Sequence, residues 1–269
     1  MDPPTDFTAT KLSDPEDEQE GFRQLAQLFT IVDGWQTEQR NELSPGQGSA
    51  LAGDDRWTHD YEVSHAVQYL LGVAVDHLHC LRMVVQTPQS FQLHLHAPFT
   101  LNRAAIEAAA TVVWLIAPAS RDERIRRRLK LATQNARDFD SLAVLVGGPS
   151  TLDDRYEKIR DVARGRANID PTGVVGTPPS MKQIINDAGA ACAVGAKAAL
   201  GAWMACSGIA HGRTWAGINL HDREELKRVR DIAGVHMTAS AGTVALMTSI
   251  SVLFVAEARR LSMERASRK

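Results

Sequence analysis

Two charged side chains interrupt an apolar stretch, residues 95–118 (LHAPFTLNRAAIEAAATVVWLIAP). Arg103 and Glu107 are four residues apart, so a helix places them on one face as an ion pair. Helical spacing predicts one narrow polar strip, made up of Thr100, Arg103, Glu107, Thr111 and Trp114. A surface helix normally has a broad polar face. The reversed proportions predict a central helix whose polar strip meets a specific partner; the alternative is a solvated strip that contributes little stability.

A second set of polar side chains precedes a break in a long apolar segment. Trp203, Ser207, His211 and Thr214 fall near one helical face, beside Gly208 and Gly212. A histidine in such a place is a general base, a hydrogen-bond donor or a buried imidazole with its bonds satisfied. Ser207 and His211 resemble a nucleophile and base only loosely, because no third group is placed by spacing.

The two sets together predict a polar pocket between two central helices. We expect Arg103 and Glu107 to be largely buried, with one of them within hydrogen-bond reach of residues 211–214. Arg103, Glu107 and His211 are the expected catalytic residues: Arg103 fixes an anionic group, Glu107 orients His211, and His211 exchanges the proton. The expected ligand-binding walls are Ser207, Arg213, Trp114, Trp203 and Trp215. The expected ligand is a small anion.

The sequence contains no motif typical of a metal site or a phosphate-binding loop. The three cysteines, Cys80, Cys192 and Cys206, are far apart, and no Cys/His zinc spacing or HExxH motif occurs. The segments 147–150 (GGPS) and 173–176 (GVVG) lack the strand and lysine of a phosphate loop. We therefore expect no metal and no cofactor.

A basic run opens the next predicted helix. It contains Arg121, Arg124, Arg126, Arg127, Arg128 and Lys130. Such a run suits a phosphate backbone, but Asp122 and Glu123 partly balance it and no aromatic residues are interleaved for base stacking. With a net charge of −2, we expect a solvated helix face and no nucleic-acid binding.

Apolar residues recur at threes and fours along most of the chain, and no alternating strand pattern was found. The expected fold is all-α, a single-domain bundle of about seven or eight helices spanning 16–265 after a disordered acidic tail, 1–15. The expected helices cover 16–43, 58–86, 98–118, 121–146, 152–167, 181–208, 222–233 and 236–262. The segments 44–55 and 168–180 are expected linkers.

The expected location is the cytoplasm. The N-terminus shows no apolar signal region, and the cysteine usage fits a reducing compartment. Residues 235–256 lack formal charges and are long enough to span a bilayer, but their many hydroxyl groups favour a helix of a soluble bundle. We expect no membrane partner.

The segments FTLNRAAIEAAATVVWLIAP and SGIAHGRTW resemble a group of uncharacterised all-helical bacterial proteins, and more distantly the HEPN-like and abortive-infection families. The arginine that HEPN ribonucleases carry shortly before their catalytic histidine is absent from 204–210. The resemblance implies the helical architecture and, as one alternative, an RNA-directed protein. The other alternative is a non-enzymatic interaction protein that forms a homodimer through the small residues of 181–208.

Overall fold

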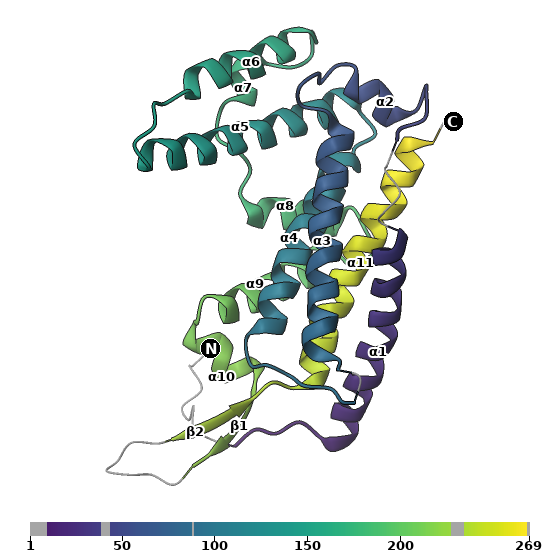
Figure 1. Cartoon of the computed structure of the whole chain (residues 1–269), viewed down its shortest axis with the longest axis vertical. Coiled ribbons are helices and arrows are strands. Elements are labelled where there is room, and N and C mark those ends of the chain that lie inside the picture. The colour runs from purple at the N-terminus through teal and green to yellow at the C-terminus, as the bar shows by residue number, and fades with distance from the viewer. Residues whose placement is uncertain (1–9, 39–43, 88, 227–233, 268–269) are drawn as a thin grey trace.

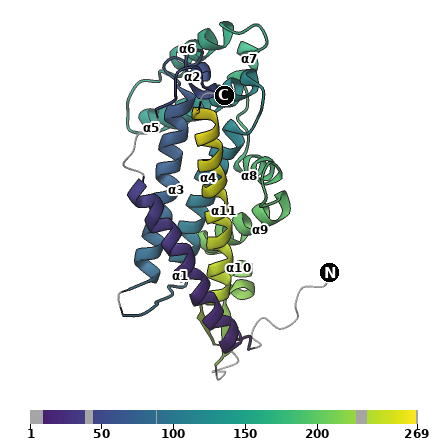
Figure 2. The same ribbon diagram turned by 90° about the vertical axis from the view of Figure 1, so that its right-hand side faces the viewer.

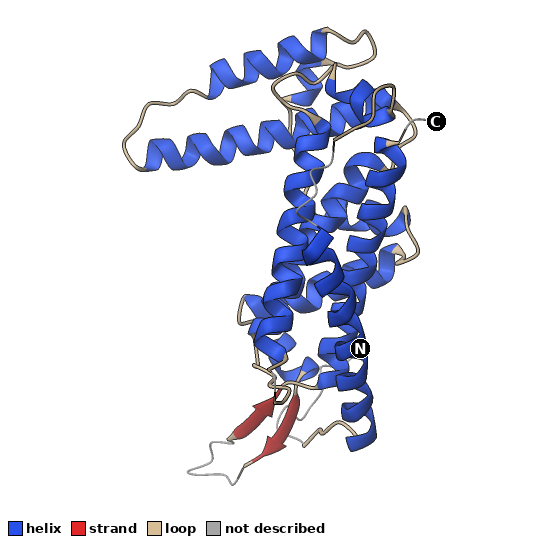
Figure 3. Cartoon of the chain, turned by 45° about the vertical axis from the view of Figure 1, so that its right-hand side comes forward, coloured by secondary structure: helices blue, strands red, loops and turns tan. Residues whose placement is uncertain are grey.

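The computed structural model describes residues 10–38, 44–87, 89–226 and 234–267. Four long helices run along one another in both views (Figures 1 and 2). They are α1 (Pro15–Glu38), α3 (Val63–Val85), α4 (Ala97–Ile116) and α11 (Ala241–Ala266). Figure 3 shows how completely helices dominate the described residues, so the all-α prediction is confirmed.

Helix α4 is the central helix. It packs against α3, α11 and α9 (Ala196–Ala210), and against α8 (Met181–Ala190). Between Ala105 and Ile116 every residue except Glu107 is buried. Pro98 lies in its first turn, where the missing N–H removes no helical bond. The expected central helix is therefore present, with its apolar faces enclosed by other helices.

Two hydroxyl groups of α11 bond to this central helix. Asn102 of α4 donates to Thr248 (Nδ2 to Oγ1, 3.1 Å) and accepts from Ser251 (Oγ to Oδ1, 2.8 Å). Both α4 and α11 are long and apolar enough to cross a bilayer, yet 72% and 56% of their most apolar windows are buried inside the protein. Two polar residues within 235–256, Thr248 and Ser251, thus join α11 to α4.

Helices α5 (Arg121–Leu145) and α6 (Leu152–Arg164) project sideways from one end of the bundle (Figure 1). They have a hydrophobic cluster of their own, which includes Ile125, Leu129 and Ile159 and is completed near α7 (Pro171–Val174). The described residues therefore have two hydrophobic clusters, and the larger one surrounds α4.

The single helix predicted over 181–208 is two helices, α8 and α9. The chain turns at Gly195, whose φ of +78° favours glycine. The close approach of α8 to α9 explains the small residues of these helices, because a Cβ added to Gly189 would lie 2.6 Å from the Cβ of Ala199. The break folds α8 against α9, and both against α4.

The helix predicted over 222–233 is wrong at its start. Asp222–Glu225 forms strand β1, which pairs antiparallel with β2 (Val235–Thr238), while 227–233 lies outside the described residues. Asp222 does not cap a helix; it accepts bonds from the backbone N–H (3.0 Å) and the hydroxyl (2.8 Å) of Ser13. Tertiary pairing has replaced the local capping pattern.

Two predicted irregular segments are partly ordered. Within the expected tail 1–15, residues 1–9 lie outside the described part, but Lys11 forms a backbone bridge to Arg223. The expected linker 44–55 contains the short helix α2 (Ala50–Asp55), capped by Ser49. With α10 (Thr214–Leu220), the described residues form eleven helices, more than the seven or eight expected, because breaks and short helices were not visible as periodicity.

Candidate functional site

The polar strip of α4 meets α9 through Glu107. Its Oε1 accepts one hydrogen bond from Arg103 Nε (2.9 Å) and a second from the indole Nε1 of Trp203 (2.7 Å). The side chains of Arg103 and Glu107 are 27% and 25% exposed. They are less buried than the sequence predicted, yet far from the fully solvated strip that was the alternative.

Arg103 also reaches the end of α9. Its Nη1 donates to Nε2 of His211 over 3.0 Å, so a neutral His211 would carry its proton on Nδ1. His211 itself is exposed and caps the C-terminus of α9. Arg103 therefore lies between Glu107 and His211, and the described residues show no direct hydrogen bond from Glu107 to His211.

Helical spacing explains why α9 presents these groups to α4. Trp203, Ser207 and His211 follow one another at intervals of four, which keeps them near one face. After His211, the positive φ of Gly212 (+62°) turns the chain into α10. A Cβ on Gly208 would lie 2.7 Å from Ala216, so only glycine permits this tight turn.

A thiol lies near the guanidinium. Burial raises the pKa of Cys206 to about 12, and the positive charge of Arg103 only partly opposes this. Cys206 is accordingly a protonated, enclosed side chain and not a nucleophile at neutral pH. The groups available for chemistry are the edge of Arg103, the half-buried Ser207 and the exposed His211.

The remaining predicted wall residues are dispersed. Trp114 is buried further along α4, where the guanidinium of Arg127 lies 4.8 Å from its ring centre. Trp215 is 49% exposed and packs against Gly208. Arg213 is exposed and lines a separate pocket of about 140 Å³ beside His96. Trp203 is the tryptophan that the structure bonds to the pair.

The basic run is largely neutralised within the chain. Asp54 is fully buried and accepts two bonds from Arg124 (2.6 and 2.8 Å) and one from Arg121 (3.2 Å). Arg126 and Arg127 both bond to Glu123. These contacts differ from the solvated face that the sequence predicted. The role of Asp54 was missed, since its partners lie about 70 residues away.

A buried histidine was also missed. His221 has no exposed surface, and neither ring nitrogen has a hydrogen-bond partner among the described residues. Its ring contacts Phe99 and His96 edge-on, with centroids 5.3 and 6.0 Å away. Burial, assisted by His96, lowers the pKa of His221 to about 4. No local sequence pattern predicts this burial, because it depends on contacts with Phe99 and His96 from a distant part of the chain.

No group of three or more His, Cys, Asp or Glu side chains in the described residues is arranged to hold a metal ion. Comparisons with protein-family models, curated proteins and solved structures gave no match. The function must therefore be argued from the geometry of Arg103, Glu107, Trp203 and His211.

Proposed function

We propose that the chain binds a small anionic ligand at the open edge of Arg103, next to Ser207 and His211. The observation that carries the proposal is that the Arg103 guanidinium is held in place but does not use all of its hydrogen-bond donors. Glu107 fixes its Nε and His211 takes Nη1, whereas the described residues form no hydrogen bond to Nη2. A guanidinium that is already oriented binds oxyanions with little further loss of side-chain freedom.

The contact with Arg103 favours binding over proton-transfer catalysis. Nε2 of His211 accepts from the guanidinium, so this lone pair is free to take a proton only after Arg103 moves away.

Sulfate is a suitable probe because it is a small oxyanion. Calorimetric titration should show saturable binding to the wild-type protein. Arg103→Met should weaken this binding by about tenfold or more. Arg23→Met is the matched control, since Arg23 forms an exposed ion pair with Glu20 on α1. Equal binding by the Arg103→Met protein, or no binding at all, would overturn the proposal.

The alternatives from the sequence receive less support. Gly189 and Gly208, two small residues of the expected dimer surface, are packed within the chain against Ala199 and Ala216. The arginines of the basic run that pair with Asp54 and Glu123 have less charge to offer a nucleic acid. We also propose a soluble, cytoplasmic protein, because the enclosure of α4 leaves little surface for lipid; a requirement for detergent during purification would contradict this.

A further inference from the structure

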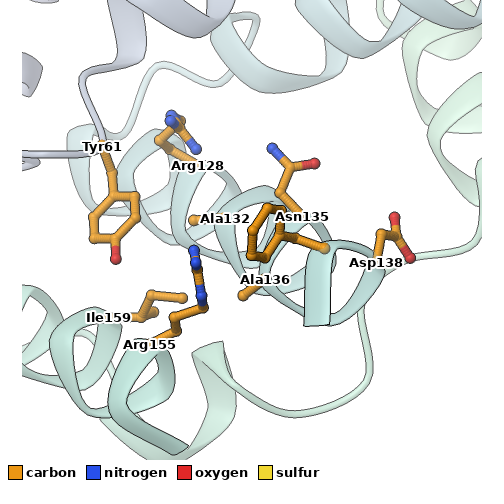
Figure 4. Close-up of a pocket in the computed structure, with 9 residues that line it drawn as sticks. Tyr61, Arg128, Ala132, Asn135, Ala136, Asp138, Arg155 and Ile159 are labelled. Carbon is orange, nitrogen blue, oxygen red and sulfur yellow. The ribbon is translucent and has the colours of Figure 1, made fainter. Parts of the chain in front are cut away.

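A second candidate site lies between α5 and α6, away from Arg103. It is a pocket of about 420 Å³, and Figure 4 shows Tyr61, Arg128 and Arg155 around it. Its full lining is Tyr61, Arg128, Ala132, Asn135, Ala136, Asp138, Phe139, Arg155 and Ile159. A second hollow, of about 430 Å³, adjoins it and shares Tyr61 and Arg155.

The two arginines of this pocket differ from most of the arginines on α5 and α6. Arg124, Arg126 and Arg127 on α5, and Arg160 and Arg164 on α6, each lie within 4.0 Å of a carboxylate. Arg137 on α5 has no carboxylate within 4.0 Å among the described residues, but its guanidinium bonds to the Tyr156 hydroxyl and to the carbonyls of Val175 and Gly176.

Arg128 and Arg155 have no carboxylate so close among the described residues. Arg128 donates from Nε to the Glu62 carbonyl (3.1 Å), and Arg155 from Nε to the Thr151 hydroxyl (2.9 Å). Their terminal nitrogens thus remain available to a ligand.

The partial burial of Arg128 strengthens its interaction with an incoming anion. Burial lowers the pKa of Arg128, although Glu62 and Asp55 lie near enough to oppose this. A partly desolvated guanidinium without an ion-pair partner gains more from an incoming anion than a solvated one. The acidic residue of the pocket, Asp138, is exposed and accepts a bond from Gln134 (2.7 Å).

Aromatic rings supply a second kind of recognition. The Arg128 guanidinium lies 5.9 Å from the Tyr61 ring centre, and that of Arg155 lies 4.4 Å from Phe139. Phe139 is 52% exposed, which leaves apolar surface at the pocket. Burial raises the pKa of Tyr61, so its hydroxyl keeps its proton and can donate a bond.

We propose that this pocket binds an aromatic anion of the aryl phosphate class. Arg128 and Arg155 take the phosphate through their free terminal nitrogens, and the ring packs against Tyr61 and the Arg155–Phe139 stack. The site shares no residue with the one at Arg103 and does not depend on it.

The test compares phenyl phosphate with inorganic phosphate and benzyl alcohol in titrations of the full chain. Phenyl phosphate should bind about tenfold more tightly than inorganic phosphate because the ring adds apolar and stacking contact, and benzyl alcohol should not saturate. Arg155→Met should weaken the binding of phenyl phosphate by about tenfold or more. Two control variants should leave this binding unchanged. They are Arg160→Met, on the same helix but paired with Glu157, and Arg103→Met.

Folding of each variant is checked by its thermal melt. Arg128→Met is a second variant of the same test. If it fails to fold, Arg155→Met still decides, because among the described residues the Arg155 guanidinium forms one hydrogen bond, to Thr151, and one ring contact, with Phe139. Absence of saturable phenyl phosphate binding, an unchanged affinity in Arg155→Met, or loss in Arg103→Met would each overturn the proposal.

Discussion

Removing the Glu107 carboxylate should destabilise the protein by an intermediate amount. Glu107→Ala deletes the acceptor of two hydrogen bonds, from Arg103 and Trp203. A fully buried pair broken in this way costs about 3–5 kcal/mol, and an exposed one less than about 1 kcal/mol. About a quarter of each charged side chain is exposed, so water can partly solvate the abandoned guanidinium. We expect a loss of about 2 kcal/mol in the free energy of unfolding.

Urea melts of a small set of variants test this reasoning. Adding Arg103→Met to Glu107→Ala should recover about 1 kcal/mol, because it removes the unpaired guanidinium. The matched control is Glu20→Ala, which breaks the exposed ion pair with Arg23 and should cost less than about 0.5 kcal/mol. If Glu107→Ala costs no more than this control, or if the double variant recovers nothing, the strip is ordinary solvated surface and the proposed anion site loses its support.

Three further predictions concern the fold and are tested by denaturant melts. Gly21→Ala should destabilise the protein by about 2 kcal/mol or more, since the added Cβ would lie 2.5 Å from the backbone of Ala241. Gly34→Ala, on the same helix, adds a Cβ with no neighbouring atom within 4 Å and should stabilise the protein by about 0.5–1 kcal/mol. Similar effects at both glycines would refute the packing of α1 on α11. Asp54→Asn should cost about 3–5 kcal/mol through its buried partner Arg124, against little change for the exposed Asp153→Asn. The pKa of His221 is lowered from 6.5 to about 4 in the folded protein. Between these pH values the unfolded chain binds one more proton than the folded one, so the free energy of unfolding should fall by about 2 kcal/mol from pH 7 to 4.5. An equally steep fall in His221→Phe would assign the effect to other groups.

The sequence by itself determined the features that depend on neighbouring residues. Apolar periodicity predicted the helical class and the central helix, because one helix turn brings residues three and four apart together. The same spacing predicted the Arg103–Glu107 pair. The expectation that this pair comes within hydrogen-bond reach of the segment around His211 followed from the unusual apolarity of α4, and the 3.0 Å contact between Arg103 and His211 agrees with it.

Only the tertiary structure decided which distant groups meet. Glu107 bonds to Trp203 across 96 residues, and Asp54 to Arg124 across 70, so neither pair leaves a periodic trace in the sequence. The hairpin overrode a local capping pattern because Ser13 and Lys11 supply Asp222 and Arg223 with partners from the other end of the chain. The aromatic and arginine side chains of the α5–α6 pocket face one another for the same reason: packing between elements, and not spacing within one, sets their distances.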